Sequence, residues 1–252
     1  MIENWPVFLV ERSFRTTSLK LTQSEAKLLA YKWELSEGGG EDSRYKVENR
    51  GEVLRRLIGK LGRRVKEYPG GCFLKVESRS PKDSYVVHKE GFKVLNGEGA
   101  LRRLSDSERI YEEITDALSF KKRPKIYFRE WWEMAGWEEF RCFVIQGRLI
   151  AVSQYNYFQE YGGIEWGNYH TAIETQWVQD LHRLSDHYPD MVMDLWVRMT
   201  VAERGRLEWR TKIVEVNPLC QMTDPCLFSW EEMEGIYRMN SSSSEFKVGI
   251  KS

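Results

Sequence analysis

Two stretches near the end of the 252-residue chain decide the fold: Met-Val-Met-Asp-Leu-Trp-Val at residues 191–197 and Ile-Val-Glu-Val-Asn-Pro-Leu at residues 213–219. Each is an apolar run typical of a buried strand, interrupted by acidic or amide side chains. Because side chains alternate between the two faces of a strand, Glu215 and Asn217 project from the same side. A turn between the strands would make them an antiparallel pair and bring Asp194 close to both.

The three polar side chains have two interpretations. Three oxygen ligands on one rigid face suit Mg²⁺, which prefers octahedral oxygen coordination and often completes it with nucleotide phosphates and water. Alternatively, each acid is neutralised by an arginine or lysine such as Lys212, because an unpaired buried carboxylate is costly. We predict a magnesium site formed by Asp194, Glu215 and Asn217, and ion pairing stays open as the alternative.

Basic residues on other predicted strands would complete a phosphate site. Lys75 alternates with apolar neighbours beside a polar loop, where its ammonium group would reach a phosphate, and Arg129 and Arg141 also lie in predicted strands. The segment Arg-Glu-Trp-Trp-Glu at residues 129–133 would let an adenine bond to the backbone and lie against aromatic surface. A core role for the two tryptophans is the alternative. Together these residues predict an ATP site.

The rest of the chain alternates predicted strands and helices, which favours an α+β fold. The Thr22-x-x-Glu25 pattern is a capping box that predicts a helix start, and Gln146-Gly147 is a typical hairpin turn. Apolar periodicity predicts helices over residues 22–33, 52–66, 107–118, 171–187 and 230–239. It predicts further strands over residues 1–10, 72–77, 85–88, 126–134, 139–145 and 148–154.

Composition restricts the partners. Thirty-eight basic residues balance thirty-eight acidic ones, so no net charge draws the molecule to nucleic acid or an anionic membrane. The basic face of the helix predicted over residues 52–66 is interpreted as solvated, with a nucleic-acid contact as the less favoured alternative. No run reaches the roughly 20 apolar residues of a membrane span. We expect a cytoplasmic protein without a membrane partner.

Several common sites are disfavoured. The chain has neither G-x-x-x-x-G-K-[ST] nor G-x-G-x-x-G, which disfavours a P-loop, a Rossmann fingerprint and a kinase glycine loop. The four cysteines show no C-x-x-C pairing, so we expect buried thiols in a reducing compartment, in preference to disulfides or a zinc site.

Three stretches resemble the eukaryotic cell division cycle protein 123 family, a divergent branch of the ATP-grasp superfamily. Residues 73–84 (Phe-Leu-Lys-Val-Glu-Ser-Arg-Ser-Pro-Lys-Asp-Ser) are similar to its lysine strand and [SA]-P-[KR]-D-[AS] loop. Residues 139–144 are similar to its E-F-R-C-F-V hairpin. The third stretch contains Val-Glu-Val-Asn-Pro at 214–218, Thr-Asp at 223–224 and Leu-Phe-Ser-Trp-Glu-Glu at 227–232.

The resemblance implies an ATP-grasp fold, an α+β architecture in which two lobes with mainly antiparallel sheets enclose a nucleotide cleft. On this basis we expect an N-terminal lobe over residues 1–124, a C-terminal lobe over residues 125–238 and a flexible tail over residues 239–252. The implied ATP contacts are Lys75, Arg129, Glu130, Trp131, Trp132, Glu139 and Arg141, and the implied magnesium ligands are Asp194, Glu215 and Asn217.

Two functions would suit such a pocket, and the fold alone does not choose between them. The eukaryotic proteins resembled here are ATP-bound assembly chaperones for the trimeric translation initiation factor 2, whereas other ATP-grasp proteins are ligases. The family usually has Asp at the position of Glu215 and Asn-Trp at the positions of Glu77 and Ser78. These departures favour an ATP-dependent ligase or modifying enzyme acting on a protein or other macromolecule. The alternative is an assembly chaperone without catalytic turnover, and no catalytic residue is assigned.

Overall fold

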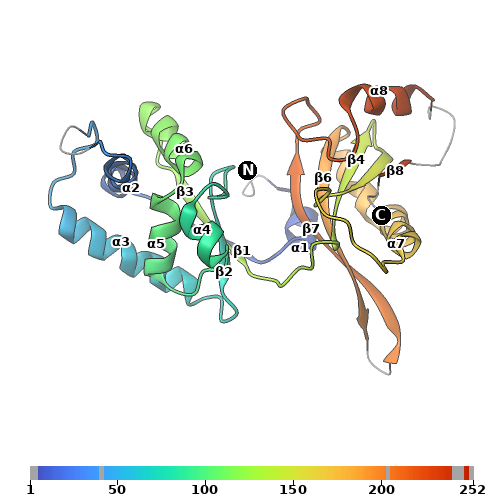
Figure 1. The fold of residues 1–252 in the computed structure, drawn as a ribbon, viewed down its shortest axis with the longest axis horizontal. Helices are drawn as coiled ribbons and strands as arrows, with labels where there is room; N and C mark the ends of the chain where they lie inside the picture. The colour runs from blue at the N-terminus through green and yellow to red at the C-terminus, as the bar shows by residue number, and fades with distance from the viewer. Residues whose placement is uncertain (1–4, 40–42, 203–204, 240–246, 250–252) are drawn as a thin grey trace. The chain divides into compact units, whose positions relative to one another are not determined.

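The computed structural model describes the chain except for residues 1–4, 40–42, 203–204, 240–246 and 250–252 (Figure 1). Its contacts divide the chain into two compact units. The first unit holds Arg15–Trp132, and the second holds residues 2–14 together with those from Glu133 onward. The expected boundary after residue 124 falls just before strand β3 (Lys125–Glu130), whose strand pairing places it in the first unit.

The first unit is an antiparallel sheet with helices packed on one face. Its strand order is β1-β3-β2, with β1 at Thr16–Lys20 and β2 at Cys72–Val76. Its helices are α2 (Gln23–Ser36), α3 (Arg50–Val65), α4 (Tyr85–Glu90), α5 (Gly97–Ser105) and α6 (Glu108–Ser119). Leu74 and Phe128 point into the apolar core beneath these helices. Side-chain alternation therefore puts Lys75 and Arg129 on the other face of the sheet.

The helix start predicted from the capping box at Thr22 and Glu25 is confirmed, and the helix predicted from periodicity over residues 107–118 also begins at a capping residue. In α2 the Glu25 amide donates to Thr22 Oγ1 at 3.2 Å, and the Thr22 amide donates to Glu25 Oε2 at 2.8 Å, which completes the capping box. Ser107 caps α6 by accepting a hydrogen bond from the Ile110 amide at 3.2 Å. Local side-chain chemistry is sufficient to position these helices.

Residues 85–88 were predicted as a strand, and this is wrong because capping contacts make them helix α4. Ser84 accepts a hydrogen bond from the Val87 amide at 3.2 Å in the first turn, and Gly91 follows the last turn with a φ of 78°. The apolar Val-Val pair suits either structure, so the caps decide. The sequence patterns also did not predict β1, which is short and polar, or α5, which begins with poor helix formers at Gly97 and Gly99.

The start of the chain also differs from its prediction. Part of the strand predicted over residues 1–10 is instead α1 (Val7–Arg12), a short helix that follows Pro6 and buries Leu9. Proline suits a helix start because it has no amide hydrogen to satisfy. Residues 1–4 lie outside the described residues.

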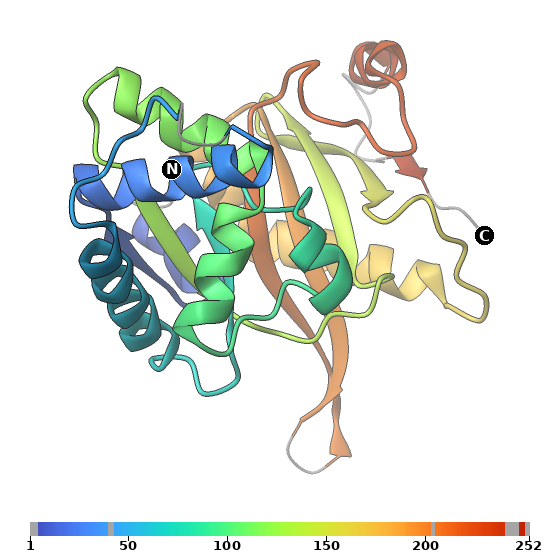
Figure 2. The same ribbon diagram turned by 60° about the vertical axis from the view of Figure 1, so that its left-hand side comes forward.

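The second unit is built on a sheet with strand order β7-β6-β4-β5-β8. Its elements are β4 (Glu139–Ile145), β5 (Arg148–Gln154), α7 (Trp166–Gln179), the 3-10 helix η3 (Leu181–Asp186), β6 (Met191–Val201), β7 (Leu207–Asn217), α8 (Trp230–Met239) and β8 (Lys247–Gly249). Neighbouring strands are antiparallel except β8, which runs parallel to β5. Figure 2 shows β6 and β7 as a long paired ribbon. The predicted turn at Gln146-Gly147 is confirmed, with φ of 49° and 72°.

Each face of this sheet carries its own apolar cluster. Cys142 and Met193 pack with α1, α7 and η3 on one face. Phe143 and Val192 pack with Met233 of α8 on the other. The alternation along β6 places Asp194 on the same face as Val192. The candidate site therefore lies on the α8 side of the sheet.

Two predictions about the last third of the chain need revision. The helix predicted over residues 171–187 is α7 followed by η3, with a break at Asp180, whose φ is −153°. The tail predicted to be flexible over residues 239–252 contains β8 at residues 247–249, and its first residue, Met239, ends α8. Residues 240–246 and 250–252 lie outside the described residues. Pairing with β5, a partner distant in sequence, makes that strand.

The four cysteines are free thiols, and the predicted burial holds for Cys72 and Cys142, whereas Cys220 and Cys226 are partly exposed. Burial raises the pKa of the Cys72 thiol to about 12, so this group stays protonated at neutral pH. Among the described helices, none combines the length and apolar character that a bilayer crossing would need.

Candidate functional site

The three predicted metal ligands lie together on one face of the second sheet. Strands β6 and β7 pair antiparallel, and Asp194 lies directly opposite Glu215. Asn217 lies opposite Val192, so the two-residue period puts its side chain on the same face. Asp194 is buried, whereas Glu215 and Asn217 are partly exposed. The arrangement brings two carboxylates and one amide to a single patch of the sheet.

Asp194 is held by Arg141 from the neighbouring strand β4. The two residues are register partners, and Arg141 Nε and Nη2 donate to Asp194 Oδ1 and Oδ2 at 2.8 and 2.9 Å. The two side chains are 7% and 1% exposed. Burial by itself would lower the pKa of Arg141, but the hydrogen bonds and charge of Asp194 outweigh it and raise that pKa above its usual range. The two residues therefore form a bidentate ion pair from which solvent is almost completely excluded.

Arg141 also ties the chain after β7 to the sheet. Its Nη1 donates to the Asp224 carbonyl at 2.6 Å, and its guanidinium carbon lies 4.8 Å from the centre of the Tyr155 ring. The Asp224 carboxylate accepts hydrogen bonds from the Tyr157 hydroxyl at 3.0 Å and from the Cys226 amide at 2.8 Å. Burial raises the pKa of the Tyr155 phenol, which keeps it neutral. One arginine thus links β4 and β6 to Tyr155, directly after β5, and to the loop after β7.

Sequence reasoning assigned no role to Tyr155, Tyr157 or Asp224. The signal available was a pair of tyrosines directly after the buried strand β5, together with an acid in the Thr223-Asp224-Pro225 turn. Neither sequence pattern indicates which residue these side chains would bond to. Only the fold brings Asp224 to Tyr157, which is 67 residues away in the sequence.

The donor set fits magnesium provided that Asp194 serves both Arg141 and the ion. Each carboxylate oxygen has two lone pairs, and Arg141 uses one on each oxygen. Asn217 Nδ2 donates to Asp194 Oδ2 at 3.3 Å, which turns the amide nitrogen toward the acid and the amide oxygen away from it. Carboxylate and amide oxygens are ligands that magnesium accepts. Among the described residues no three His, Cys, Asp or Glu side chains form a metal-binding group, and the predicted set depends on the amide of Asn217.

The ion-pair alternative holds for Asp194 itself. Its partner is Arg141, 53 residues earlier in the chain. Lys212, the example offered by the sequence, donates through Nζ to the Ser13 carbonyl at 3.0 Å. The sequence could not select Arg141, because the register between two strands that are not consecutive decides the contact. Pairing with Arg141 does not by itself exclude a metal ligand role for Asp194.

Lys75 and Arg129 share one face of the first unit's sheet. Lys75 lies opposite Tyr127, and Arg129 lies opposite Phe73, in the pairing of β2 with β3. Arg129 is buried and Lys75 is partly exposed. The structure therefore brings these two predicted phosphate contacts onto one face.

The segment predicted to contact adenine follows them directly. The Glu130 amide donates to the Arg15 carbonyl at 2.8 Å, and the Trp131 amide donates to the Gly71 carbonyl at 3.1 Å. These backbone donors are engaged within the first unit, and Trp132 is its last residue. Glu139 belongs to the second unit, where it lies opposite Trp196. The ATP contacts of these residues stay predictions.

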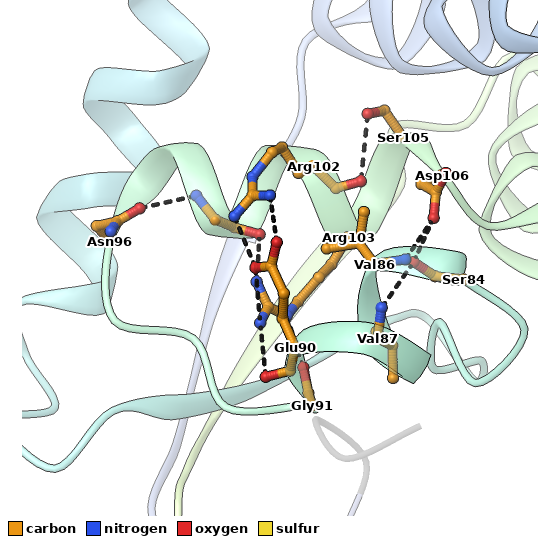
Figure 3. A network of polar contacts seen from close by, with 11 residues as sticks. Ser84, Val86, Val87, Glu90, Gly91, Asn96, Arg102, Arg103, Ser105 and Asp106 are labelled. Carbon is orange, nitrogen blue, oxygen red and sulfur yellow. Dashed lines mark hydrogen bonds and ion pairs between the residues drawn. The ribbon is translucent and has the colours of Figure 1, made fainter.

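The loop at residues 80–84, which resembles a family motif, is fixed by capping contacts. The Asp83 carboxylate accepts a hydrogen bond from the Arg109 amide at 3.0 Å in the first turn of α6. The Ser84 hydroxyl donates to Asp106 at 2.6 Å, as Figure 3 shows. Both acids therefore have a structural role at helix ends.

Comparisons with known proteins were consistent with this architecture. The sequence model of a family described as D123 matches residues 8–251. A Schizosaccharomyces pombe protein named translation initiation factor eIF2 assembly protein is 28% identical over 214 residues, which cover 78% of this chain and 61% of the relative. A Danio rerio protein of the same name is 33% identical over 129 residues, covering 50% and 34%. Cell division cycle protein 123 of Eremothecium gossypii is 28% identical over 176 residues, covering 65% and 46%.

A solved structure of Cdc123 from Schizosaccharomyces pombe superposes with a TM-score of 0.71 at 23% identity, covering 100% of this chain and 94% of that one. At this identity the likeness shows the fold alone, a mixed α+β architecture with antiparallel and mixed sheets. The matched regions span 61%, 56% and 52% of the lengths of three curated relatives.

Proposed function

Because the chain belongs to the D123 family, we propose that it binds a subunit of a translation initiation factor 2 complex and assists the assembly of that complex. The observation that carries the proposal is the shared name of the relatives from Schizosaccharomyces pombe, Xenopus tropicalis and Danio rerio, each a translation initiation factor eIF2 assembly protein. Of the two functions that the sequence leaves open, this favours the chaperone. The preference for a ligase rested on a few residues, such as Glu215, that differ from the family pattern, and the chaperone proposal replaces it.

ATP and magnesium enter this proposal as bound ligands. Asp194, Glu215 and Asn217 would hold the ion, which when bound supplies positive charge to nucleotide phosphates. Arg141 keeps the Asp194 carboxylate in one orientation through two hydrogen bonds, so this ligand is preorganised. Lys75, Arg129, Glu130, Trp131, Trp132 and Glu139 are the further proposed ATP contacts. The ATP-grasp assignment belongs to the same proposal and is supported by the motif resemblance.

The partner proposal is tested with purified proteins. The chain is mixed with each subunit of translation initiation factor 2 in turn, with and without magnesium and ATP, and complexes are separated by size-exclusion chromatography. We expect one subunit to co-elute and ADP or AMP not to accumulate over many turnovers. Binding to no subunit would contradict the proposal. Sustained turnover with a covalently altered acceptor would restore the ligase.

The ligand proposal needs a variant that keeps the buried ion pair. Glu215→Gln retains the size of the side chain. It keeps both residues of the Arg141–Asp194 ion pair in the chain, because Glu215 is a separate, partly exposed residue on the neighbouring strand β7. We expect magnesium-dependent ATP affinity, measured by calorimetry, to fall at least about tenfold, the loss of one charged ligand worth about 1.4 kcal/mol. Glu208→Gln, on an exposed part of β7, is the matched control. Equal affinity of the two variants would remove Glu215 from the site.

A further inference from the structure

The first unit contains a cavity of about 660 Å³ that none of the proposed ATP or magnesium residues lines. It lies between the last turns of α6, the turn after β2 and the ends of β1 and β3, all of which belong to Arg15–Trp132. Cavities of a few hundred cubic ångströms are the usual size of ligand pockets. The charges and hydrogen-bonding groups of its lining indicate the class of ligand that it would bind.

Four of the positive groups that line this cavity have no acidic partner among the described residues. Lys20, Lys121 and Lys122 are exposed, and within the described chain no carboxylate forms an ion pair with any of their ammonium groups. Arg123 is also exposed and donates through Nε to the Leu21 carbonyl at 2.9 Å, which leaves its charge uncompensated. Four cations at one opening create a local positive potential in a chain of zero net charge.

The carboxylates of the cavity are largely engaged within the unit. Glu77 Oε1 accepts a hydrogen bond from the Lys125 amide at 2.8 Å. Glu113 accepts one from the Ser78 hydroxyl at 3.2 Å, and it lies 3.6 Å from Arg79 Nε. Asp116 is the exposed acid of the lining. The rim is therefore cationic, while the lining keeps acceptors for hydrogen-bond donors.

Lys121 occupies a backbone position that favours glycine. Helix α6 ends in a Schellman motif, in which the Lys122 amide donates to the Ala117 carbonyl at 2.8 Å and the Lys121 amide donates to the Leu118 carbonyl at 3.0 Å. Lys121 has a φ of 53°, in the left-handed region that costs energy for any residue with a Cβ. Replacement of Lys121 by glycine would therefore relieve this backbone cost and remove one cation of the rim at the same time.

An aromatic ring completes the rim. Phe120 is 72% exposed, and Lys122 Nζ lies 5.6 Å from its ring centre. A large exposed apolar side chain bordered by charges is typical of a protein contact. The ring offers an apolar anchor beside the cations.

We propose that this cavity binds an acidic peptide segment of a protein partner, with carboxylates facing Lys20, Lys121 and Lys122 and an apolar side chain against Phe120. A peptide backbone also supplies N–H donors for Glu113 and Asp116. The sugar–phosphate backbone of DNA offers only acceptors, and the phosphates of any nucleic acid would be repelled by these acids, so the lining favours a peptide. The inference deepens the proposed function, on which it rests for the existence of a partner.

The test uses the whole chain and a short fluorescein-labelled peptide in which glutamates surround one leucine. Fluorescence anisotropy is measured at low and high salt, and the same peptide with lysines in place of the glutamates is the negative probe. We expect the glutamate peptide to bind, the lysine peptide not to bind, and the binding to weaken with salt. Failure of the glutamate peptide to bind overturns the inference.

The decisive variant is Lys121→Gly, because it removes one cation and places the preferred residue at the left-handed position. We expect the Tm to rise while peptide affinity falls about threefold to fivefold, the effect of one exposed ion pair. Arg55→Ala, which removes one exposed charge from α3, is the matched control and leaves affinity unchanged. Equal weakening by both variants, or tighter binding of an oligothymidine than of the glutamate peptide, overturns the inference.

The outcomes separate this inference from the proposed function. Peptide binding that depends on Lys121, without binding of any initiation factor subunit, supports the cavity and contradicts the assembly proposal. If the chain binds a subunit but does not bind the glutamate peptide, the result contradicts the cavity proposal and leaves the assembly proposal in place.

Discussion

Each unit of this chain contains an arginine that donates two hydrogen bonds to one carboxylate, yet the two ion pairs differ in how much of their side chains is exposed to solvent. Arg141 contacts Asp194 at 2.8 and 2.9 Å within the second sheet. Arg102 contacts Glu90 at 2.5 and 2.7 Å between α5 and α4 of the first unit (Figure 3). The side chains of the first pair are 7% and 1% exposed, and those of the second are 53% and 37% exposed. Because the two pairs share the same hydrogen-bond geometry, we expect burial to decide how much each pair contributes to the free energy of unfolding.

The physical reason is the cost of removing charge from water. A buried ion loses several kcal/mol of hydration, which only its partner restores, whereas water solvates either member of an exposed pair when the other is removed. Arg103, next to Arg102, shows another solution. Its guanidinium is buried, donates to the Gly91 and Gly99 carbonyls at 2.9 and 3.1 Å, and has its pKa lowered by burial.

The largest expected effect comes from breaking the buried pair on one side. Arg141→Met leaves the Asp194 carboxylate buried without its partner and also releases the Asp224 carbonyl. We expect a loss of about 3–5 kcal/mol in the free energy of unfolding, measured by urea titration. A loss below about 1 kcal/mol would mean that solvent reaches Asp194 and that burial does not distinguish the two pairs.

Removing both charges should restore much of that stability. Arg141→Met combined with Asp194→Leu replaces the ion pair by apolar side chains, and such replacements are often neutral or stabilising. We expect the double variant to lie within about 1–2 kcal/mol of the wild type in the same titration, giving a large coupling energy in the double-mutant cycle. Additive losses would show that each residue acts through other contacts.

An intermediate effect is expected at Glu25, a buried carboxylate in the first unit that meets Lys60 Nζ at 2.8 Å. Burial raises its pKa, but hydrogen bonds from Lys60 and Thr22 outweigh this and lower the pKa below its ordinary value of 4.5. Glu25→Gln keeps an acceptor for the Thr22 amide but removes the charge that faces Lys60, which should cost about 1 kcal/mol at neutral pH.

The pH dependence of that loss follows from the sign of the shift. A carboxylate whose pKa is lower in the folded state stabilises the fold above its unfolded pKa, and this contribution disappears as the pH falls through the folded pKa. The difference in unfolding free energy between wild type and Glu25→Gln should therefore be constant near neutral pH and shrink as the pH falls below about 4. A difference that grows in acid would contradict the lowered pKa.

The smallest effect is expected for the exposed pair. Arg102→Gln removes the exposed guanidinium of the pair and leaves Glu90 in place beside Arg103, and water replaces the lost contact with Glu90. We expect no change in Tm at high salt and only a slight decrease at low salt, because ions screen exposed charges. A decrease comparable to that of Arg141→Met would remove the distinction between the two pairs.

Much of the local structure was predictable from the sequence. The bounds of β4, β5 and α8 agree with the predicted ranges, because apolar periodicity, the Gln146-Gly147 turn and helix-forming residues act over a few positions. The two-residue period of a strand was also enough to place Glu215 and Asn217 on one face. These features depend on neighbours in the chain, which a sequence displays directly.

The tertiary structure decided what depends on distant partners. Asp106, 22 residues away, helps to make a helix of the segment after Ser84, and β5 makes a strand of residues 247–249. The partner of Asp194 is Arg141 because the register of β4 against β6 sets these residues side by side. The sequence alone determined that Glu215 and Asn217 share one face of a strand. The fold brought Asp194 to the same face of the sheet and paired it with Arg141, since a buried charge takes its partner from whichever strand packing brings within reach.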